Sequence, residues 1–223
     1  MKRPYVILNA ATTLDGKIAT KDGDSKISSK EDINRLHELR KEVDAVLIGV
    51  GTVLADNPAL TVRHAEGSNP IRIVADSRAR TPPDSKVLDD SAPTIIATSN
   101  KAAAPDVQKL RDVGAQVIIA GEGVVDLSKV LQQLYNQGVK KLLLEGGSEL
   151  NWSMLKQGLV DEVRITVSPR IIGGVGAKSL VGGDGVSKIS DSIKLELCSV
   201  QKSEGDVLLV YKVKGVESVE KVE

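Results

Sequence analysis

Hydrophobic residues along the chain gather in short runs that alternate with amphipathic stretches. Several runs are continuous and rich in β-branched residues, which is typical of strands buried on both faces. The runs predict nine strands: Tyr5–Ala10, Ala45–Val50, Ile71–Ala75, Thr94–Thr98, Gln116–Ala120, Lys141–Leu144, Glu162–Val167, Leu195–Val200 and Val207–Val213. The last three alternate or lengthen, which indicates antiparallel partners at the C-terminal side of the sheet.

Helical patterns fall between these runs. The sequence Ser28-Ser29-Lys30-Glu31 predicts a capping box, in which a serine hydroxyl accepts an early helical N–H and Glu31 reaches back. Asp126 is expected to cap a helix with apolar residues at i, i+3, i+4 and i+7, and Gly138 to follow its C-cap. Two further helices are expected over Asp106–Val113, closed by Gly114, and from about Glu149 to Gln157.

This alternation predicts an α/β fold with a mixed, largely parallel central sheet and helices on both faces. We expect a single domain over residues 1–215 and a polar C-terminal tail over residues 216–223. Phe is absent and aromatic residues make up only 2%, so the core must be built from aliphatic side chains. Ligands of such sheets bind at the carboxyl ends of strands, where candidate chemistry is therefore sought.

Charge and cysteine content exclude several classes of function. Lys plus Arg and Asp plus Glu are balanced at 30 each, so bulk charge favours neither nucleic acid nor an anionic membrane. No apolar run approaches the roughly 18 residues of a membrane span, and a cytoplasmic protein is expected. The single cysteine, Cys198, is expected to be a small buried residue. His37 and His64 lack metal-ligand spacing and are assigned to structure or surface, so no metal is expected.

The segment Leu142–Leu150 runs from a buried strand through two glycines into a helix. Glycines let the backbone approach a ligand closely, and a helix N-terminus presents N–H groups that suit a diphosphate. The alternative is an ordinary tight turn. Glu145 ends the strand, where a carboxylate can bind a nitrogen-rich ring or handle a proton. The alternative for Glu145 is a solvated loop acid.

Two other strand ends carry polar residues. After Ala45–Val50, a glycine-containing segment leads into a short helical turn in which Thr52 is the expected N-cap. Thr52 and Asp56 share a face and can contact the sugar hydroxyls or amide of a dinucleotide. After Ile71–Ala75, Ser77 and the arginine that follows it can bind a ribose 2′-phosphate. Plain capping and a solvated loop are the respective alternatives.

Basic side chains are also candidates for anion binding. Arg40 lies on the first long helix, and Arg63 follows a short apolar run. Two arginines that converge would suit a phosphate ester, although each alone is more often a surface charge. Lys17 lies in a Thr-Leu-Asp-Gly-Lys segment and is a candidate for proton handling.

Six segments occur in an order that is specific as a set. They are TLDGKIA (Thr13–Ala19), GDSKIS (Gly23–Ser28), GVGTVLADNPALTVR (Gly49–Arg63), PIRIVADSRAR (Pro70–Arg80), LLLEGGSELNWSMLKQGLVDEV (Leu142–Val163) and SPRIIGG (Ser168–Gly174). From about Tyr5 to Lys214 the chain resembles the riboflavin biosynthesis reductase family, in particular its stand-alone archaeal form.

The resemblance implies a dihydrofolate-reductase-like fold, NADPH as hydride donor and, usually, a homodimer. The implied reaction reduces the ribosyl side chain of 2,5-diamino-6-ribosylamino-4(3H)-pyrimidinone 5′-phosphate to the ribityl form. The chain lacks the zinc motif of the deaminase that accompanies bacterial members. Three alternatives remain open: reduction of the deaminated pyrimidine, a dihydrofolate-type reductase, and a non-catalytic nucleotide-binding module.

The resemblance also implies roles for individual residues. Glu145 and Lys17 are the catalytic candidates. The implied substrate contacts are Ser25, Arg40, Leu60, Arg63 and Glu145. The implied cofactor contacts are Ile27, Thr52, Asp56, Ser77, Gly146, Gly147, Ser148, Glu149 and Leu150. An acid beside a diphosphate is unfavourable, so Glu149 is expected to point outward and to contribute only its backbone.

Overall fold

The computed structural model describes residues 2–63 and 67–215. The expected α/β fold with a mixed, largely parallel sheet is confirmed, and every predicted strand is present. The described residues form two compact units, 2–5 with 37–143, and 6–36 with 144–215. The expected single domain over residues 1–215 stays a prediction, and His64 and the tail over residues 216–223 lie outside the described residues.

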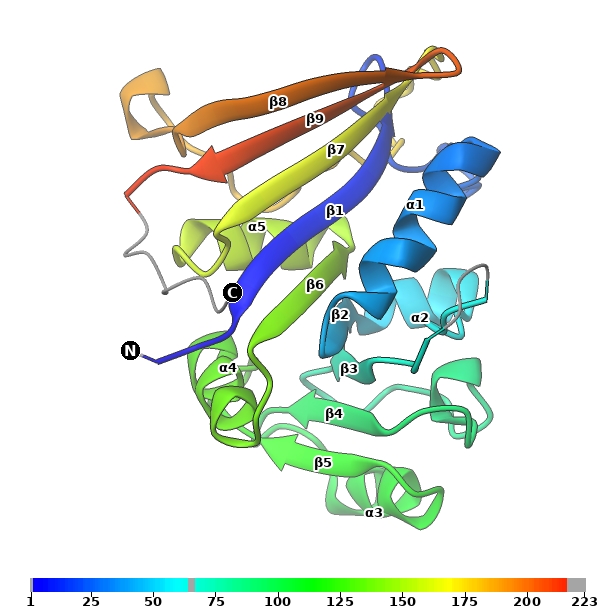
Figure 1. Cartoon of the computed structure of the whole chain (residues 1–223). Coiled ribbons are helices and arrows are strands. Elements are labelled where there is room, and N and C mark those ends of the chain that lie inside the picture. Colours follow the sequence, from blue (N-terminus) through cyan, green and yellow to red (C-terminus); the bar gives the residue numbers. More distant parts are fainter. Residues whose placement is uncertain (1, 64–66, 216–223) are drawn as a thin grey trace. The chain divides into compact units, whose positions relative to one another are not determined.

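The first unit contains four parallel strands in the order β5-β4-β3-β2, which can be followed in Figure 1. Their bounds are β2 (Ala45–Gly49), β3 (Ile71–Ala75), β4 (Thr94–Thr98) and β5 (Gln116–Ile119). Strands β2 and β4 are buried almost throughout, as continuous apolar runs predict. The helices are α2 (Val50–Asp56), α3 (Ala104–Asp112) and α4 (Leu127–Asn136), with the 3₁₀ turn η1 (Lys86–Leu88).

The helix termini of the first unit test the capping predictions. Asp126 caps α4 by accepting the N–H of Lys129 at 3.0 Å, and Gly138 follows the C-cap with φ +99°, both as predicted. The expectation that Thr52 is an N-cap is wrong, because α2 begins at Val50 and Gly49 is its N-cap. The glycine adopts the extended N-cap conformation, and Thr52 therefore lies inside the helix.

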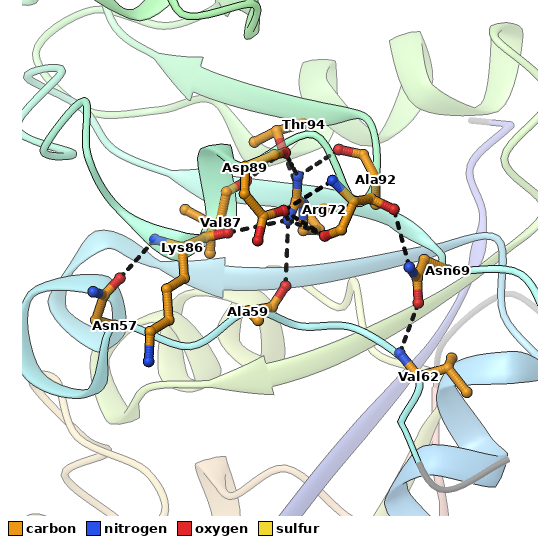
Figure 2. Close-up of polar contacts among 11 residues, drawn as sticks. Asn57, Ala59, Val62, Asn69, Arg72, Lys86, Val87, Asp89, Ala92 and Thr94 are labelled. Atoms are coloured by element: carbon orange, nitrogen blue, oxygen red, sulfur yellow. Dashed lines mark hydrogen bonds and ion pairs between the residues drawn. The ribbon is translucent and has the colours of Figure 1, made fainter.

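A fully buried arginine organises the connection between β3 and β4. Arg72 on β3 has no exposed surface, and its guanidinium donates to Asp89 and several backbone carbonyls, as Figure 2 shows. It also donates to the hydroxyl of Ser91 at 3.2 Å. Its Nε donates to the hydroxyl of Thr94 at 2.9 Å. Since an unpaired buried charge is strongly destabilising, these acceptors are a requirement for folding this connection. We refer to Arg72, Asp89, Ser91 and Thr94 as the Arg72 cluster.

The second unit contains the strands β1 (Tyr5–Thr13), β7 (Glu162–Ser168), β9 (Asp206–Val213) and β8 (Leu195–Ser203), which follow one another in this order in Figure 1. β1 and β7 are parallel, whereas β7 pairs with β9 and β9 with β8 in antiparallel fashion. The predicted antiparallel pairing at the C-terminal side is confirmed. Strand β6 (Lys141–Gly146) contributes residues to both units, and α5 (Ser148–Lys156) and η2 (Ile189–Asp191) belong to the second.

Helix α1 (Lys30–Lys41) starts with a serine cap one position later than the predicted capping box requires, since the hydroxyl of Ser29, and not of Ser28, accepts the N–H of Asp32 at 3.2 Å. The second half of the predicted box differs: the Glu31 carboxyl is hydrogen-bonded to Glu204, which raises the pKa of Glu204. The residue three positions after Ser29 is Asp32, so Glu31 is one position too early to reach back.

The expectation that Cys198 is buried is wrong, because this cysteine is exposed. It lies on β8, which pairs only with β9 among the described strands and is exposed over most of its length. An edge strand without covering elements cannot bury a small apolar side chain. No helix in the described part of the chain is long and apolar enough to cross a lipid bilayer.

The Arg72 cluster predicts a pH dependence of stability. The Ser91 hydroxyl, followed by the Arg72 guanidinium, lowers the pKa of Asp89 from 3.8 to about 2. The contribution of the ionised carboxylate is therefore complete above pH 3.8 and is lost as the pH falls through about 2. Urea unfolding should show that Asp89→Asn destabilises the protein more at pH 7 than at the low end of this range.

The exposed neighbour Asp90 offers a matched control, since Asp90→Asn removes a charge at the next position outside the cluster. A loss of stability in Asp89→Asn that is the same at every pH would contradict the assigned ion pair.

Candidate functional site

The turn between β6 and α5 is the strongest candidate for a diphosphate site. Gly147 is the N-cap of α5 and supplies no side-chain hydrogen bond to it, and the Gly146–Gly147 peptide bond is cis. The first turn of a helix has N–H groups without intrahelical acceptors, and they carry a partial positive charge. This end of α5 therefore has the backbone chemistry that binds an anion.

Gly146 shows why the turn needs glycine. Its φ is +91°, and a Cβ built there would lie 3.3 Å from Nδ2 of Asn151. Asn151 itself is buried, donates from Nδ2 to the carbonyl of Leu180 at 2.9 Å, and has an Oδ1 without a hydrogen-bond partner among the described residues. The turn is thus a cradle that a side chain at position 146 would fill.

A loop around Gly182–Asp184 is fastened to the first turns of α5. The N–H of Gly182 donates to the carbonyl of Ser148 at 3.1 Å, and the N–H of Gly183 donates to Oε1 of Glu149 at 3.2 Å. Glu149 is exposed, and its carboxylate contacts this loop, while the expectation that it contributes only its backbone to a cofactor stays a prediction.

Asp184 strengthens this attachment from the far side of the loop. Its carboxylate accepts from Nζ of Lys156 at 2.7 Å and from the indole N–H of Trp152. The Lys156 ammonium, followed by the Trp152 indole, lowers the pKa of Asp184. Asp184 thus adds an ion pair with Lys156 to the contacts that Gly182 and Gly183 make with α5.

Lys17 has structural contacts that the sequence did not predict. Its ammonium donates to the carbonyl of Ala177 at 3.3 Å and to the hydroxyl of Ser179 at 3.2 Å, and the Lys17 backbone forms a bridge with Ser179. The same segment is held by Asp15, whose pKa is lowered by the Thr13 hydroxyl and by backbone N–H groups at residues 172 and 173. A catalytic role of Lys17 stays a prediction beside this anchoring role.

The remaining candidates of the second unit differ in burial. Glu145 is half-buried at the end of β6, next to the glycine turn. Ile27 is buried, and Ser25 is exposed, with its carbonyl accepting the N–H of Ile27 at 2.8 Å. The second unit thus holds the predicted contacts Lys17, Ser25, Ile27, Glu145 and Gly146–Leu150.

In the first unit the two candidate arginines meet at one segment. Arg40 is buried on α1, and its guanidinium donates to the carbonyl of Thr61 at 3.0 Å. The N–H of Arg63, two residues further on, donates to Nδ1 of His37 at 3.2 Å. His37 is buried and structural, as predicted. Its spacing from Arg40, three residues on one helix, is the signal that could have linked it to this segment.

The other first-unit candidates lie after β2 and β3. Thr52 is half-buried within α2, and Asp56 is exposed at its last residue. Ser77 is half-buried, and its hydroxyl accepts the N–H of Val125 at 3.1 Å. No role was predicted for Asp76, which is fully buried and accepts the N–H and hydroxyl of Thr81 at 2.7 and 2.8 Å. An aspartate that opens a turn is the signal that could have identified it.

Comparisons with known proteins place these residues in context. The family model described as RibD C-terminal domain matches residues 4–209. A relative from Methanothermobacter thermautotrophicus, named 2,5-diamino-6-ribosylamino-4(3H)-pyrimidinone 5′-phosphate reductase, is 52% identical over 96% of this chain and 100% of its own length.

Solved structures show the same similarity in three dimensions. A diaminohydroxyphosphoribosylaminopyrimidine deaminase/5-amino-6-(5-phosphoribosylamino)uracil reductase from Thermotoga maritima has a TM-score of 0.80 and 31% identity, over 95% of this chain and 57% of that protein. Dihydrofolate reductase from Enterococcus faecalis has a TM-score of 0.51 and 14% identity, over 94% of this chain and 96% of that protein. The latter likeness concerns the fold alone.

The close packing of the Gly182–Asp184 loop on α5 predicts that adding a methyl group at Gly183 destabilises the protein. A Cβ at Gly183 would lie 1.8 Å from Cδ1 of Trp152, whereas one at Gly185 would meet nothing within 4 Å, and both glycines have positive φ. Gly183→Ala should therefore destabilise the protein more than Gly185→Ala in urea unfolding. It should also shift the fluorescence of Trp152, the single tryptophan of the chain. Equal fluorescence and stability in the two variants would contradict the loop–helix contact.

Proposed function

Because the chain belongs to the RibD C-terminal domain family, we propose that it is the NADPH-dependent reductase of 2,5-diamino-6-ribosylamino-4(3H)-pyrimidinone 5′-phosphate in riboflavin biosynthesis. The observation that supports this most strongly is the match to a relative of that name over that relative's whole length. The glycine turn at α5 fits a diphosphate, and the contact of Arg40 with the segment that carries Arg63 is compatible with a phosphate-ester site.

The alternatives have less support. The relative named for the uracil form also carries a deaminase in its name, and the chain spans only 57% of it. The likeness to dihydrofolate reductase, at 14% identity, does not extend to substrate. A non-catalytic module would need only one ligand set, whereas this chain has candidates for both cofactor and substrate.

We assign the cofactor to two kinds of group, which are the backbone of the glycine turn for its diphosphate and side chains for its sugars, its amide and its 2′-phosphate. The backbone over Gly146–Leu150 would hold the diphosphate, and the cradle at Gly146 fits this use. Ser77, with the arginine after it, would select the 2′-phosphate of NADPH over NADH. Thr52 and Asp56 would contact sugar hydroxyls or the amide, and Ile27 would pack against the cofactor. NADPH supplies the hydride when it is bound.

The substrate contacts follow from charge and position. Arg40 and Arg63 would bind the 5′-phosphate together with Ser25, as the resemblance to the family implies. Arg40 contacts the carbonyl of Thr61, in the segment that carries Arg63. Leu60 would pack against the substrate, and Glu145 would hydrogen-bond the pyrimidine. These contacts orient the substrate and restrict its motion, which lowers the barrier before any bond changes.

Reduction of a ribosylamine needs proton transfer as well as a hydride. The ribose ring opens to an imine, and C1′ then accepts the hydride. The opening and the neutralisation of the product require a group that moves a proton, and the half-buried Glu145 is the residue we assign to it. Lys17, or a bound water, is the alternative proton carrier.

Turnover is followed as the loss of absorbance at 340 nm with NADPH and freshly made diamino substrate. Glu145→Gln keeps the shape of the side chain but cannot accept the proton, so kcat/KM should fall about 10²-fold or more. Glu122→Gln, which changes an exposed acid elsewhere, is the matched control and should behave like wild type.

Other outcomes would redirect the assignment. Turnover of the deaminated counterpart or of dihydrofolate alone would keep the cofactor and change the substrate. Binding of NADPH without consumption of any of these substrates would support the binding module instead.

We also propose that the protein is a cytoplasmic homodimer. A phosphorylated substrate does not cross membranes, so its reductase belongs where the substrate is made. The exposed side chains of Leu195, Leu197 and Val200 on the edge strand β8 support self-association, since an apolar edge is rarely left open.

Light scattering after size exclusion should give the mass of a dimer for wild type. Leu197→Lys should shift the population toward monomer, because it places a charge on the apolar edge. Val113→Lys changes another exposed apolar residue, at the C-cap of α3, and should leave the dimer intact. A monomeric wild type would refute the homodimer.

A further inference from the structure

We propose that Arg72 is a positioning residue for the substrate segment Asn57–Arg63, which carries Leu60 and Arg63; this rests on the proposed function. Arg72 is fully buried and its guanidinium donates to the connection between β3 and β4, so we assign it no contact with the substrate itself. It acts through the loop between β3 and β4, which it holds in one conformation and which in turn is bonded to the segment. The chain of contacts is visible in Figure 2.

The segment needs external support. Leu60 has φ +55°, in the left-handed region that non-glycine residues rarely adopt, and it is buried. A residue in this conformation persists only where its surroundings hold it. Asn57 at the C-cap of α2 is also left-handed, with φ 42°. The segment therefore starts from a helix end and passes through a second unfavourable conformation before it reaches Arg63.

Two asparagine side chains link this segment to the Arg72 loop. Oδ1 of Asn57 accepts the N–H of Lys86 at 2.8 Å, and Oδ1 of Asn69 accepts the N–H of Val62 at 2.8 Å. Nδ2 of Asn69 also donates to the carbonyl of Ser91 at 3.0 Å, so this amide bridges the segment and the Arg72 cluster. In Figure 2 the sticks of Asn57 and Asn69 lie at opposite sides of the Arg72 side chain.

Arg72 reaches both attachment points of the loop. Its Nη1 donates to the carbonyl of Lys86 at 3.2 Å and to the hydroxyl of Ser91 at 3.2 Å, next to the groups that the two asparagines hold. A longer contact of 3.5 Å joins Nη1 to the carbonyl of Ala59 in the segment itself. A guanidinium has five donors in a planar fork, and a lysine cannot reproduce this set of contacts.

The opposite side of the segment is held by α1. Arg40 donates to the carbonyl of Thr61, and His37 accepts the N–H of Arg63. Loosening the Arg72 side should therefore disturb the position of Arg63 and its contact with His37, although Arg72 touches neither. The expected consequence is weaker binding of the pyrimidine phosphate, without loss of the chemistry.

Three variants test this inference. Arg72→Lys keeps the buried charge but loses the fork, and Asn69→Ala cuts the bridge without changing the buried charge. Asn100→Ala is the matched control, because Oδ1 of Asn100 accepts the N–H of Gly123 at 3.0 Å and so joins two other loops. For the first two, KM for the pyrimidine should rise about tenfold while kcat stays within about twofold of wild type. The control should keep the wild-type KM.

Hydrogen exchange of the Arg63 amide gives a readout that does not depend on turnover. This amide should exchange faster in Arg72→Lys and Asn69→Ala than in wild type or Asn100→Ala. If Arg72→Lys does not fold, Asn69→Ala decides the question alone. Variants with lower thermal stability but unchanged KM and unchanged Arg63 exchange would overturn the positioning role.

Failure of the proposed function is distinguishable from failure of this inference. If no pyrimidine phosphate supports NADPH consumption by the wild type, the proposed function is refuted. Exchange of the Arg63 amide still shows, in that case, whether Arg72 holds the segment. Unchanged exchange in an enzyme that does turn over would refute the inference and leave the function in place.

Discussion

A guanidinium that is completely buried requires hydrogen-bond acceptors for its N–H groups. In the first unit this requirement determines the conformation of the connection between β3 and β4. Arg72 meets it with backbone carbonyls of the β3–β4 connection and with the carboxylate of Asp89. Because these acceptors come from one stretch of the connection, residues 86–92, this stretch has to wrap around one side chain. The residues that follow α2 are bonded to that loop, so their conformation depends on the same buried charge.

The second unit relies on close backbone approach instead of buried charge. Gly146 has a positive φ and lies close against the Asn151 amide, and Gly183 has no room for a side chain beside Trp152. These contacts bring the loop at Gly182–Asp184 onto α5 and leave the helix N-terminus capped by Gly147, without a side-chain cap. Glycine therefore serves two purposes here: it presents backbone N–H groups at the turn, and it lets a loop lie directly against the helix.

Local sequence signals predicted most of the elements. All strands were predicted because their apolar runs are continuous or alternate with period two, and Asp126 and Gly138 marked the ends of α4. The errors were also local in origin. Thr52 has a good capping side chain, but Gly49 starts the helix earlier, and Cys198 follows an apolar pattern on a strand that nothing covers. The choice between two possible first residues of a helix and the exposure of an edge strand both depend on more than the few residues around the position.

The sequence by itself determined the order of strands and helices, the glycine turn after β6 and, through six ordered segments, the family. These features depend on residues near one another in the chain, so pattern and propensity suffice to identify them. Only the tertiary structure decided that Arg72 is buried, that Arg40 and Arg63 meet at one segment, and that Lys17 anchors a distant loop. Burial and three-dimensional geometry decide which residues far apart in the chain become hydrogen-bond partners. The sequence around a charged residue does not indicate these partners.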